Sequence, residues 1–324
     1  MYRPKKTYKF KQLFALITLL VLIIIFSLFG KRFFSTDMML TIVESSYSIL
    51  TMALGLTFII ITGGIDLSLG AVAMCGAIVA GVASTKWGLP LWVGLSLIPV
   101  LTTLFGCLNG FLIAYCGLQP FIATLGTQML ATGVGYIVSE VQTIRFPTIT
   151  SAEGWFKRVF FKTVSGVPIA LIYIVILILL AWFLLTKTRV GKYACAIGSN
   201  KEAARLSGVN VRKWQMGIYA MSGIFTAFSA LYYVCVYSSI LPGSGAGQET
   251  DCIAAIVIGG TSMAGGAGSI WGTVVGVFIM SVLKTGLLTV GLRQQWQVLF
   301  TGLVLIGAIL LDVMKFGKGE TKKI

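Results

Sequence analysis

Long apolar segments recur along nearly the whole of this 324-residue chain and restrict its fold more than any other feature. A helix of about 20 apolar residues is long enough to cross the hydrocarbon core of a bilayer. The sequence therefore predicts an all-α polytopic membrane protein with about ten transmembrane helices, some of them short or broken. The expected spans are 12–30, 43–62, 67–85, 90–116, 120–139, 167–186, 214–238, 251–263, 268–290 and 294–312.

The composition agrees with a membrane protein and argues against a nucleic-acid-binding one. Hydrophobic residues make up 57% of the chain and charged residues 11%, and the mean hydropathy is +0.94. Soluble domains carry about 25% charged residues. The net charge of +15 comes from Lys and Arg gathered beside apolar segments. That arrangement is typical of cytoplasmic loops, so we expect membrane lipid, and no nucleic acid, to be a partner.

The distribution of basic residues also orients the chain. We expect a cytoplasmic tail at 1–11, a transmembrane domain at 12–312 and a second cytoplasmic tail at 313–324. This topology places 187–213 in the cytoplasm and 140–166 outside. The cytoplasmic segments then hold sixteen Lys and Arg residues, and the outer segments hold eight. Both termini are therefore expected to be cytoplasmic.

The residue inventory leaves little room for catalysis. The chain has no histidine, and its six cysteines show no C-x-x-C spacing, so we expect no catalytic site, metal or cofactor. No G-x-x-x-x-G-K-[ST] run is present, so the chain cannot bind ATP through a P-loop of its own. We expect a non-enzymatic membrane protein that draws energy from a partner subunit or from an ion gradient.

The cytoplasmic segment 187–213 contains the signature of a short helix. Ser199 and Glu202 have the S-x-x-E spacing of a capping box, and Gly208 is placed to end the helix in the left-handed conformation. A helix this short barely forms alone in water, so another surface must hold it. It either lies on anionic lipid or docks a cytosolic partner, and its two alanines favour docking. The expected docking residues are Ser199, Asn200, Lys201, Glu202, Ala203, Ala204, Arg205 and Gly208.

Glycine pairs interrupt two of the apolar segments, and one of them is followed by a carboxylate. Asp66 lies in T-G-G-I-D-L-S-L-G, and a second glycine-rich run follows span 251–263. Asp66 could cap the next helix or form a local gate, line a pathway, or couple transport to an ion. The topology places it near the cytoplasmic end of a span, which favours the cap. The residues expected to break helices or form a gate are Gly63, Gly64, Asp66, Gly265 and Gly266.

Uncharged polar side chains lie in or beside the fourth and fifth expected spans. Such groups form hydrogen bonds between helices, and they also suit the lining of a pathway for a polar solute. The candidates are Asn109, Gln119, Thr124 and Gln128. The charged outer segment 140–166 is either a solvated loop or a docking surface for an external protein.

Five stretches in register along residues 45–312 resemble the permease subunits of ATP-binding-cassette (ABC) importers, in the ribose-type branch that carries sugars. They are G-G-I-D-L-S-L-G at 63–70, P-F-I-A-T-L-G-T at 120–127, Y-A-C-A-I-G-S-N-K-E-A-A-R-L-S-G-V-N at 193–210, D-C-I-A-A-I-V-I-G-G-T-S-M-A-G-G-A-G-S-I-W-G-T at 251–273 and Q-Q-W-Q at 294–297. The chain departs from the common family pattern at 194–200 and at Ala267, which leaves the substrate open.

The resemblance implies an assembly in the bacterial inner membrane. It would contain two permease subunits, identical or different, with the pathway at their interface. Two cytosolic ATP-binding subunits and a periplasmic or lipid-anchored sugar-binding protein would complete it. A short cytosolic helix, matched here by 200–208, would sit in a groove of the ATPase and couple it to the permease. The expected solute is a monosaccharide such as ribose, xylose or galactose; a nucleoside, a signalling furanose, or ion-coupled secondary transport through Asp66 are the alternatives.

Overall fold

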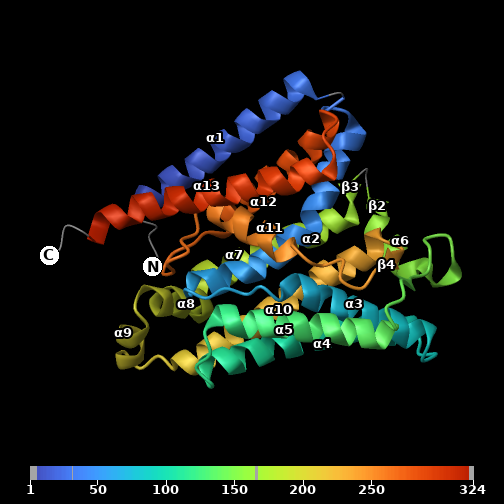
Figure 1. Cartoon of the computed structure of the whole chain (residues 1–324), viewed down its shortest axis with the longest axis horizontal. Helices are drawn as coiled ribbons and strands as arrows, with labels where there is room; N and C mark the ends of the chain where they lie inside the picture. Colours follow the sequence, from blue (N-terminus) through green and yellow to red (C-terminus); the bar gives the residue numbers. More distant parts are fainter. Residues whose placement is uncertain (1–5, 31, 165–166, 321–324) are drawn as a thin grey trace.

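Helices form most of the computed structural model, which describes residues 6–30, 32–164 and 167–320 (Figure 1). Each of the ten segments expected to span the membrane contains a helix. The helices are α1 (Lys6–Phe29), α2 (Thr36–Ile61), α3 (Leu69–Thr85), α4 (Leu91–Ala114), α5 (Pro120–Ser139), the 3-10 helix η1 (Ala152–Gly154), α6 (Trp155–Phe161), α7 (Ile169–Lys187), α8 (Arg189–Ser199), α9 (Lys201–Leu206), α10 (Val211–Val236), α11 (Gln248–Ile258), α12 (Ile270–Thr289) and α13 (Gln294–Glu320).

Six helices in the described part of the chain are long and apolar enough to cross a membrane: α2, α4, α5, α7, α10 and α12. Shorter apolar stretches lie in α1, α3 and α13, and α11 has only 11 residues. The chain is therefore a multi-pass, all-α membrane protein with some short helices. The total of ten spans stays a prediction.

The core is built around α2 and α10. From Leu50 to Ile61 every side chain of α2 is buried, as expected for a helix that is apolar on all sides. Glycines let neighbouring helices approach α10 closely: a Cβ on Gly55 of α2 would lie 2.9 Å from the Phe225 Cβ. A Cβ on Gly106 of α4 would lie 2.5 Å from the Tyr219 carbonyl oxygen. Close backbone approach of this kind stabilises helix packing in lipid.

The two ends of the molecule differ in character. Figure 1 shows α8 and α9 at the same end as the beginning of α1 and the end of α13. The strands and α6 gather at the opposite end. There β1 (Ile144–Arg145) pairs antiparallel with β4 (Ser239–Ile240), and β2 (Thr163–Val164) pairs antiparallel with β3 (Val167–Pro168). The basic segment 187–213, the beginning of α1 and the end of α13 thus share one end, and its cytoplasmic side stays a prediction.

Both expected helix breaks are present. Residues 62–68 separate α2 from α3, and 259–269 separate α11 from α12. Gly63, Gly265 and Gly266 have positive φ, a conformation that glycine adopts without strain. The two breaks touch, because the Gly266 N–H donates a hydrogen bond of 2.8 Å to the Ile61 carbonyl oxygen.

Candidate functional site

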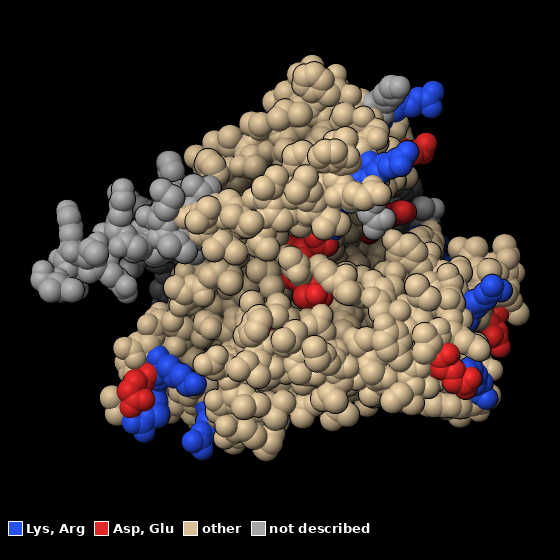
Figure 2. Space-filling model, viewed as in Figure 1, with Lys and Arg blue, Asp and Glu red and all other residues tan. Residues whose placement is uncertain are grey.

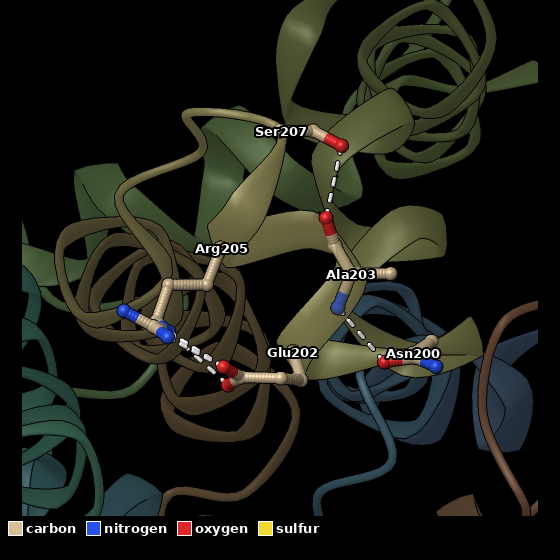
Figure 3. Close-up of polar contacts among 5 residues, drawn as sticks. All are labelled: Asn200, Glu202, Ala203, Arg205 and Ser207. Carbon is tan, nitrogen blue, oxygen red and sulfur yellow. Dashed lines mark hydrogen bonds and ion pairs between the residues drawn. The ribbon is translucent and has the colours of Figure 1, made fainter.

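The short helix α9 forms where the sequence predicts it, but its first turn is capped differently (Figure 3). Asn200 is extended (φ −162°), and its Oδ1 accepts a hydrogen bond of 2.9 Å from the Ala203 N–H. Ser199 belongs to the last turn of α8, so it cannot cap α9. The Glu202 carboxylate accepts hydrogen bonds from Arg205 at 2.5 to 3.1 Å. The prediction of a Ser199–Glu202 capping box is therefore wrong.

The end of α9 is confirmed at Gly208, which has a φ of +83°. Its N–H donates to the Arg205 carbonyl oxygen, and the Val209 N–H donates to the Ala204 carbonyl oxygen, at 3.0 and 3.1 Å. These two bonds make a Schellman motif, which satisfies carbonyl groups at a helix end. A residue with a side chain would be strained at position 208.

The surface that α9 presents is polar with one apolar side chain. Ala204 is buried against Ile197 and Val211, so it anchors the helix and does not contribute to the contact surface. Ala203 is exposed, and Leu206 is 75% exposed. Lys201 and Arg205, the two basic residues of α9, are exposed as well.

The exposed ion pair between Glu202 and Arg205 fixes the orientation of these two side chains but adds little to the stability of the fold. The Arg205 guanidinium lowers the pKa of Glu202, first through its hydrogen bonds and then through its charge. The carboxylate in turn raises the pKa of Arg205. Exposed pairs of this kind contribute little to stability in water. The pair therefore fixes how the two side chains face a partner.

The end of α8 packs directly against both helix breaks. A Cβ on Gly198 would lie 1.9 Å from the Ile61 carbonyl oxygen and 2.4 Å from the Gly266 backbone nitrogen. A Cβ on Gly265 would lie 3.0 Å from the Gly198 carbonyl oxygen. Sequence reasoning missed Gly198; its place beside the expected docking residues was the available signal. The α8–α9 segment thus packs against the turns that precede α3 and α12.

A buried polar cluster holds the first break. Asp66 Oδ1 accepts hydrogen bonds from the Ser68 N–H (2.9 Å) and Oγ (2.6 Å), and Oδ2 accepts from Asn109 Nδ2 (3.2 Å). Thr127 Oγ1 donates to Asn109 Oδ1 at 2.6 Å. Tyr219 Oη donates to the Ile65 carbonyl oxygen at 3.1 Å. The cluster therefore joins the turn to α4 and α5, and the tyrosine joins it to α10.

This arrangement corrects three sequence-based expectations. Asp66 does not cap α3, because Ser68 is the N-cap residue and makes no side-chain cap bond; Asp66 closes the turn before it. Asn109 and Thr124 are fully buried, so neither lines an open pathway within this chain. Asn109 bonds between helices, and Thr124 Oγ1 donates within its own helix to the Pro120 carbonyl oxygen.

Acidic side chains lie in a hollow near the centre of the face shown in Figure 2. Glu249 and Asp251 begin α11 and are almost fully buried. Asp251 forms an ion pair with Lys284 of α12. Glu249 Oε1 accepts from the Gly247 N–H at 3.0 Å, whereas Oε2 has no hydrogen-bond partner among the described residues. A Cβ on Gly70 would lie 2.6 Å from that oxygen, so the carboxylate meets the first turn of α3. Sequence reasoning missed both acids, although acidic residues number only ten in the chain.

A small cavity of about 120 Å³ lies between α3, α5 and the segment before α11. Gln128 and Tyr136 of α5 line it together with Met74 of α3 and Gly245. Gln119 is exposed at the start of α5, where its side chain makes no cap bond. Of the four polar candidates, Gln128 is the one that the structure places at a cavity.

Comparison with known proteins places the chain among transport permeases. A family profile described as "Branched-chain amino acid transport system / permease component" matches residues 38–309. The chain is 35% identical to the ribose import permease protein of Haemophilus influenzae, over 91% of each chain. It is 34% identical to the fructose import permease protein of Rhizobium meliloti, over 92% of this chain and 84% of that one. It is 33% identical to the galactose/methyl galactoside import permease protein of Salmonella typhimurium, over 93% and 94%.

The profile match covers the helix breaks, the polar cluster and the α8–α9 segment. The chain therefore belongs to this family of transport-system permease components. Comparison with solved structures gave no match.

Proposed function

We propose that the chain is the permease subunit of an ATP-driven ABC importer and forms the membrane pathway for a monosaccharide. The observation that carries the proposal is its similarity, over more than 90% of its length, to import permeases named for ribose, fructose and galactose. A solute of the ribose, xylose or galactose type fits that group. The family description names branched-chain amino acids, so the family is not restricted to sugars. A nucleoside or a signalling furanose is therefore kept as the second candidate.

The proposed assembly lies in the bacterial inner membrane with both ends of this chain in the cytoplasm. It holds a second permease subunit, identical or different, two cytosolic ATP-binding subunits, and a periplasmic or lipid-anchored sugar-binding protein. The excess of basic residues in 187–213 and in the two tails supports the orientation. The binding protein would dock at the opposite end, where β1, β4 and α6 lie.

The hollow on the face of Figure 2 is the proposed half-pathway, which the second permease subunit would complete. Gln128 lines the cavity of about 120 Å³ between α3, α5 and the segment before α11. Gln248 and Glu249 each carry a buried oxygen without a partner in the described part of the chain. Sugar hydroxyls donate and accept hydrogen bonds, so Gln128 suits a sugar pathway, whereas the oxygens of Gln248 and Glu249 would meet a sugar only if the pathway opened around them. A pathway with few strong partners also avoids trapping its solute.

The proposed coupling route runs from α9 through α8 to the two helix breaks. α9 would dock on the ATPase through the exposed side chains of Lys201, Glu202, Ala203, Arg205 and Leu206. Movement of α8 would reach Gly265 and Gly266 directly, because Gly198 contacts both residues. The turn at 259–269 would then move against the fixed turn at 62–68, and the two would form a gate at the cytoplasmic end of the pathway.

An ion-coupled secondary transporter is the rival proposal, with Asp66 as the coupling carboxylate. The packing of Asp66 argues against it. Its oxygens accept hydrogen bonds from Ser68 and Asn109, and the side chain is fully buried. An ion-coupling carboxylate needs a route to solvent on each side in turn.

Transport into proteoliposomes separates the two proposals. The chain is reconstituted with its ATP-binding subunits and the external binding protein, and uptake of radiolabelled ribose, galactose and a nucleoside is measured. We expect ATP-dependent uptake of a monosaccharide that requires every component. Uptake by the chain alone, driven by a proton or sodium gradient, would refute the importer proposal.

A further inference from the structure

A second cavity, of about 370 Å³, lies far from the proposed coupling route, between α2, α6, α7 and α10. Its wall is almost entirely apolar. Ile176 and Leu180 of α7 line it and are 54% and 45% exposed, so the cavity borders the outer surface of a spanning helix. In a membrane that surface meets lipid acyl chains.

The length of the cavity fits one leaflet of a bilayer. Its lining residues on α7 extend from Ala170 to Leu180, which is about 15 Å at the rise of an α-helix. The hydrocarbon core of a bilayer is about 30 Å thick. The cavity therefore begins at the end of the span nearest α6 and reaches to about the middle of the membrane, the depth of one acyl chain.

One polar group in the wall lacks a partner. Tyr232 is 6% exposed, lines the cavity, and its Oη makes no hydrogen bond within the described residues. Its ring packs edge-on against Tyr47, which also lines the cavity. Tyr232 lies four residues from the end of α10, about 6 Å along the helix axis. A buried hydroxyl usually has a partner, and the ester carbonyl of a lipid lies at this shallow depth.

Two basic residues of the α6 segment are sequence neighbours of residues that line the cavity. Val159 and Phe160 of α6 line it, and the exposed Arg158 and Lys162 lie beside them in sequence. The Lys162 carbonyl oxygen accepts a hydrogen bond from the Ile169 N–H, which holds Lys162 next to the first residues of α7. Arg158 uses one N–H group on the Ala152 carbonyl oxygen, and guanidinium has five.

A third basic residue of α6 is already engaged. Lys157 is buried, and its Nζ donates to Ser238 Oγ at 2.9 Å. Glu153 is the acidic residue of the adjoining η1 helix. Arg158 and Lys162 thus stay exposed, with Glu153 as the acidic residue of the adjoining helix. The exposed Glu44 of α2 also lies within electrostatic range of Tyr232 and Tyr47.

We propose that this cavity binds an anionic phospholipid, with one acyl chain in the apolar cavity, its ester group at Tyr232 and its phosphate at Arg158 and Lys162. The three features match the three parts of one molecule: an apolar channel one leaflet long, a hydroxyl donor at ester depth, and cations at headgroup level. The lipid would hold α6 against α7 and α10, at the end of the molecule where we propose that the external binding protein docks.

Native mass spectrometry of the full chain, purified in detergent, tests the proposal. The delipidated chain is titrated with phosphatidylglycerol and, separately, with phosphatidylcholine. Each basic residue near a membrane surface changes the binding of anionic lipid by about fivefold. We expect one phosphatidylglycerol to bind at least about fivefold more tightly than phosphatidylcholine.

Two variants locate the site and one serves as a control. Arg158→Gln with Lys162→Gln should abolish the preference for phosphatidylglycerol, whereas Tyr232→Phe should weaken both lipids. Arg293→Gln changes an exposed basic residue in the connection between α12 and α13, away from the cavity, and should leave the preference unchanged. All three variants change side chains without changing helix packing, so they should fold.

The expected pattern is specific to this cavity. Equal binding of the two lipids to the unchanged chain would overturn the proposal, as would a preference retained by the Arg158→Gln, Lys162→Gln variant. Unchanged lipid binding by Ala170→Phe, which places a ring in the cavity, would also overturn it. If Ala170→Phe does not fold, unchanged binding of both lipids by Tyr232→Phe would overturn the proposal instead.

Discussion

Two breaks interrupt the helices at the α8–α9 end of the molecule, and they are held in different ways. Residues 62–68 are fixed by side chains: Asp66 bonds Ser68 and Asn109, and Tyr219 bonds the Ile65 carbonyl. The second break is held mainly by its backbone, with bonds such as Ser262 N–H to the Ala267 carbonyl.

The difference indicates which break is free to move. The polar cluster fastens the first break to α4, α5 and α10, so it is the fixed reference. The second break, residues 259–269, packs against Ile61 and Gly198 through the backbone of its glycines. These contacts include no side-chain hydrogen bonds. We infer that the second break follows α8, whereas the first does not. The predictions below test this difference, starting from the largest expected effect.

Gly198→Ala should have the largest effect, because it damages the contact between α8 and both breaks. Its Cβ would lie 1.9 Å from the Ile61 carbonyl oxygen, and backbone cannot yield as a flexible side chain can. Overpacking costs about 1 to 3 kcal/mol, and we expect the upper end here. Melting of the purified chain and ATP-dependent uptake should both fall sharply.

Gly217→Ala is the matched control, since a Cβ on Gly217 of α10 would meet nothing within 4 Å. It should be neutral or slightly stabilising, because alanine is the better helix former. Equal melting of the two variants would contradict the packing of α8 on the breaks.

Asp66→Ala should come next, because it removes the centre of the cluster that fixes the first break. Ser68 and Asn109 would lose a charged acceptor in a buried site, at a cost of about 2 to 3 kcal/mol. Asp66→Asn keeps one acceptor oxygen and should cost about 1 kcal/mol. Thermal melting of the purified variants measures the order. An Asp66→Asn variant that melts like the unchanged chain but does not transport would favour the coupling-carboxylate proposal instead.

Glu202→Gln should hardly change melting, because the ion pair with Arg205 is exposed. It should weaken coupling to the ATPase, because the pair orients both side chains toward the partner. The pair also gives a pH dependence with a definite sign. Arg205 lowers the pKa of Glu202, so the pair is complete above the pKa of a free glutamate. It is lost only as pH falls through the lowered value. Stimulated ATPase activity of the Gln variant that matches the unchanged chain at every pH would exclude a role for the pair.

The smallest effect is in the labelling rate of a thiol on α8, which reports how this helix packs and leaves the stability unchanged. Burial raises the pKa of the Cys195 thiol on α8 to about 11. Cys195 should therefore resist maleimide at pH 7 and react only as the pH nears that value, whereas Cys116 is exposed and should be labelled. Mass spectrometry of labelled peptides measures both sites. Rapid labelling of Cys195 at pH 7 in the resting protein would contradict the packing of α8.

The elements of the fold that follow from local chemistry could be predicted from the sequence. The apolar segments gave the helices, and glycine pairs marked both breaks, because few other residues tolerate positive φ. Gly208 marked the end of α9 for the same reason. Residue chemistry alone decides these positions.

The side-chain partners could not be predicted in this way. Whether Ser199 or Asn200 caps α9 depends on where α8 ends, and that end depends on packing against Ile61 and Gly266. One partner of Asp66, Asn109, comes from a different helix 43 residues further along the chain. Contacts at that separation depend on how the helices pack, which the local pattern does not specify.

The coupling ratio of a Gly208→Val variant tests the central claim most directly. Gly208 ends α9 with a φ of +83°, so a β-branched residue would disrupt α9 without touching the breaks or the hollow. In proteoliposomes with the ATPase and binding protein, ATP hydrolysed and sugar accumulated are measured together. We predict continued ATP hydrolysis with uptake reduced at least about tenfold, within the range of coupling energies between distant sites. An unchanged ratio of sugar to ATP in a normally assembled transporter would contradict the role of α9 in coupling.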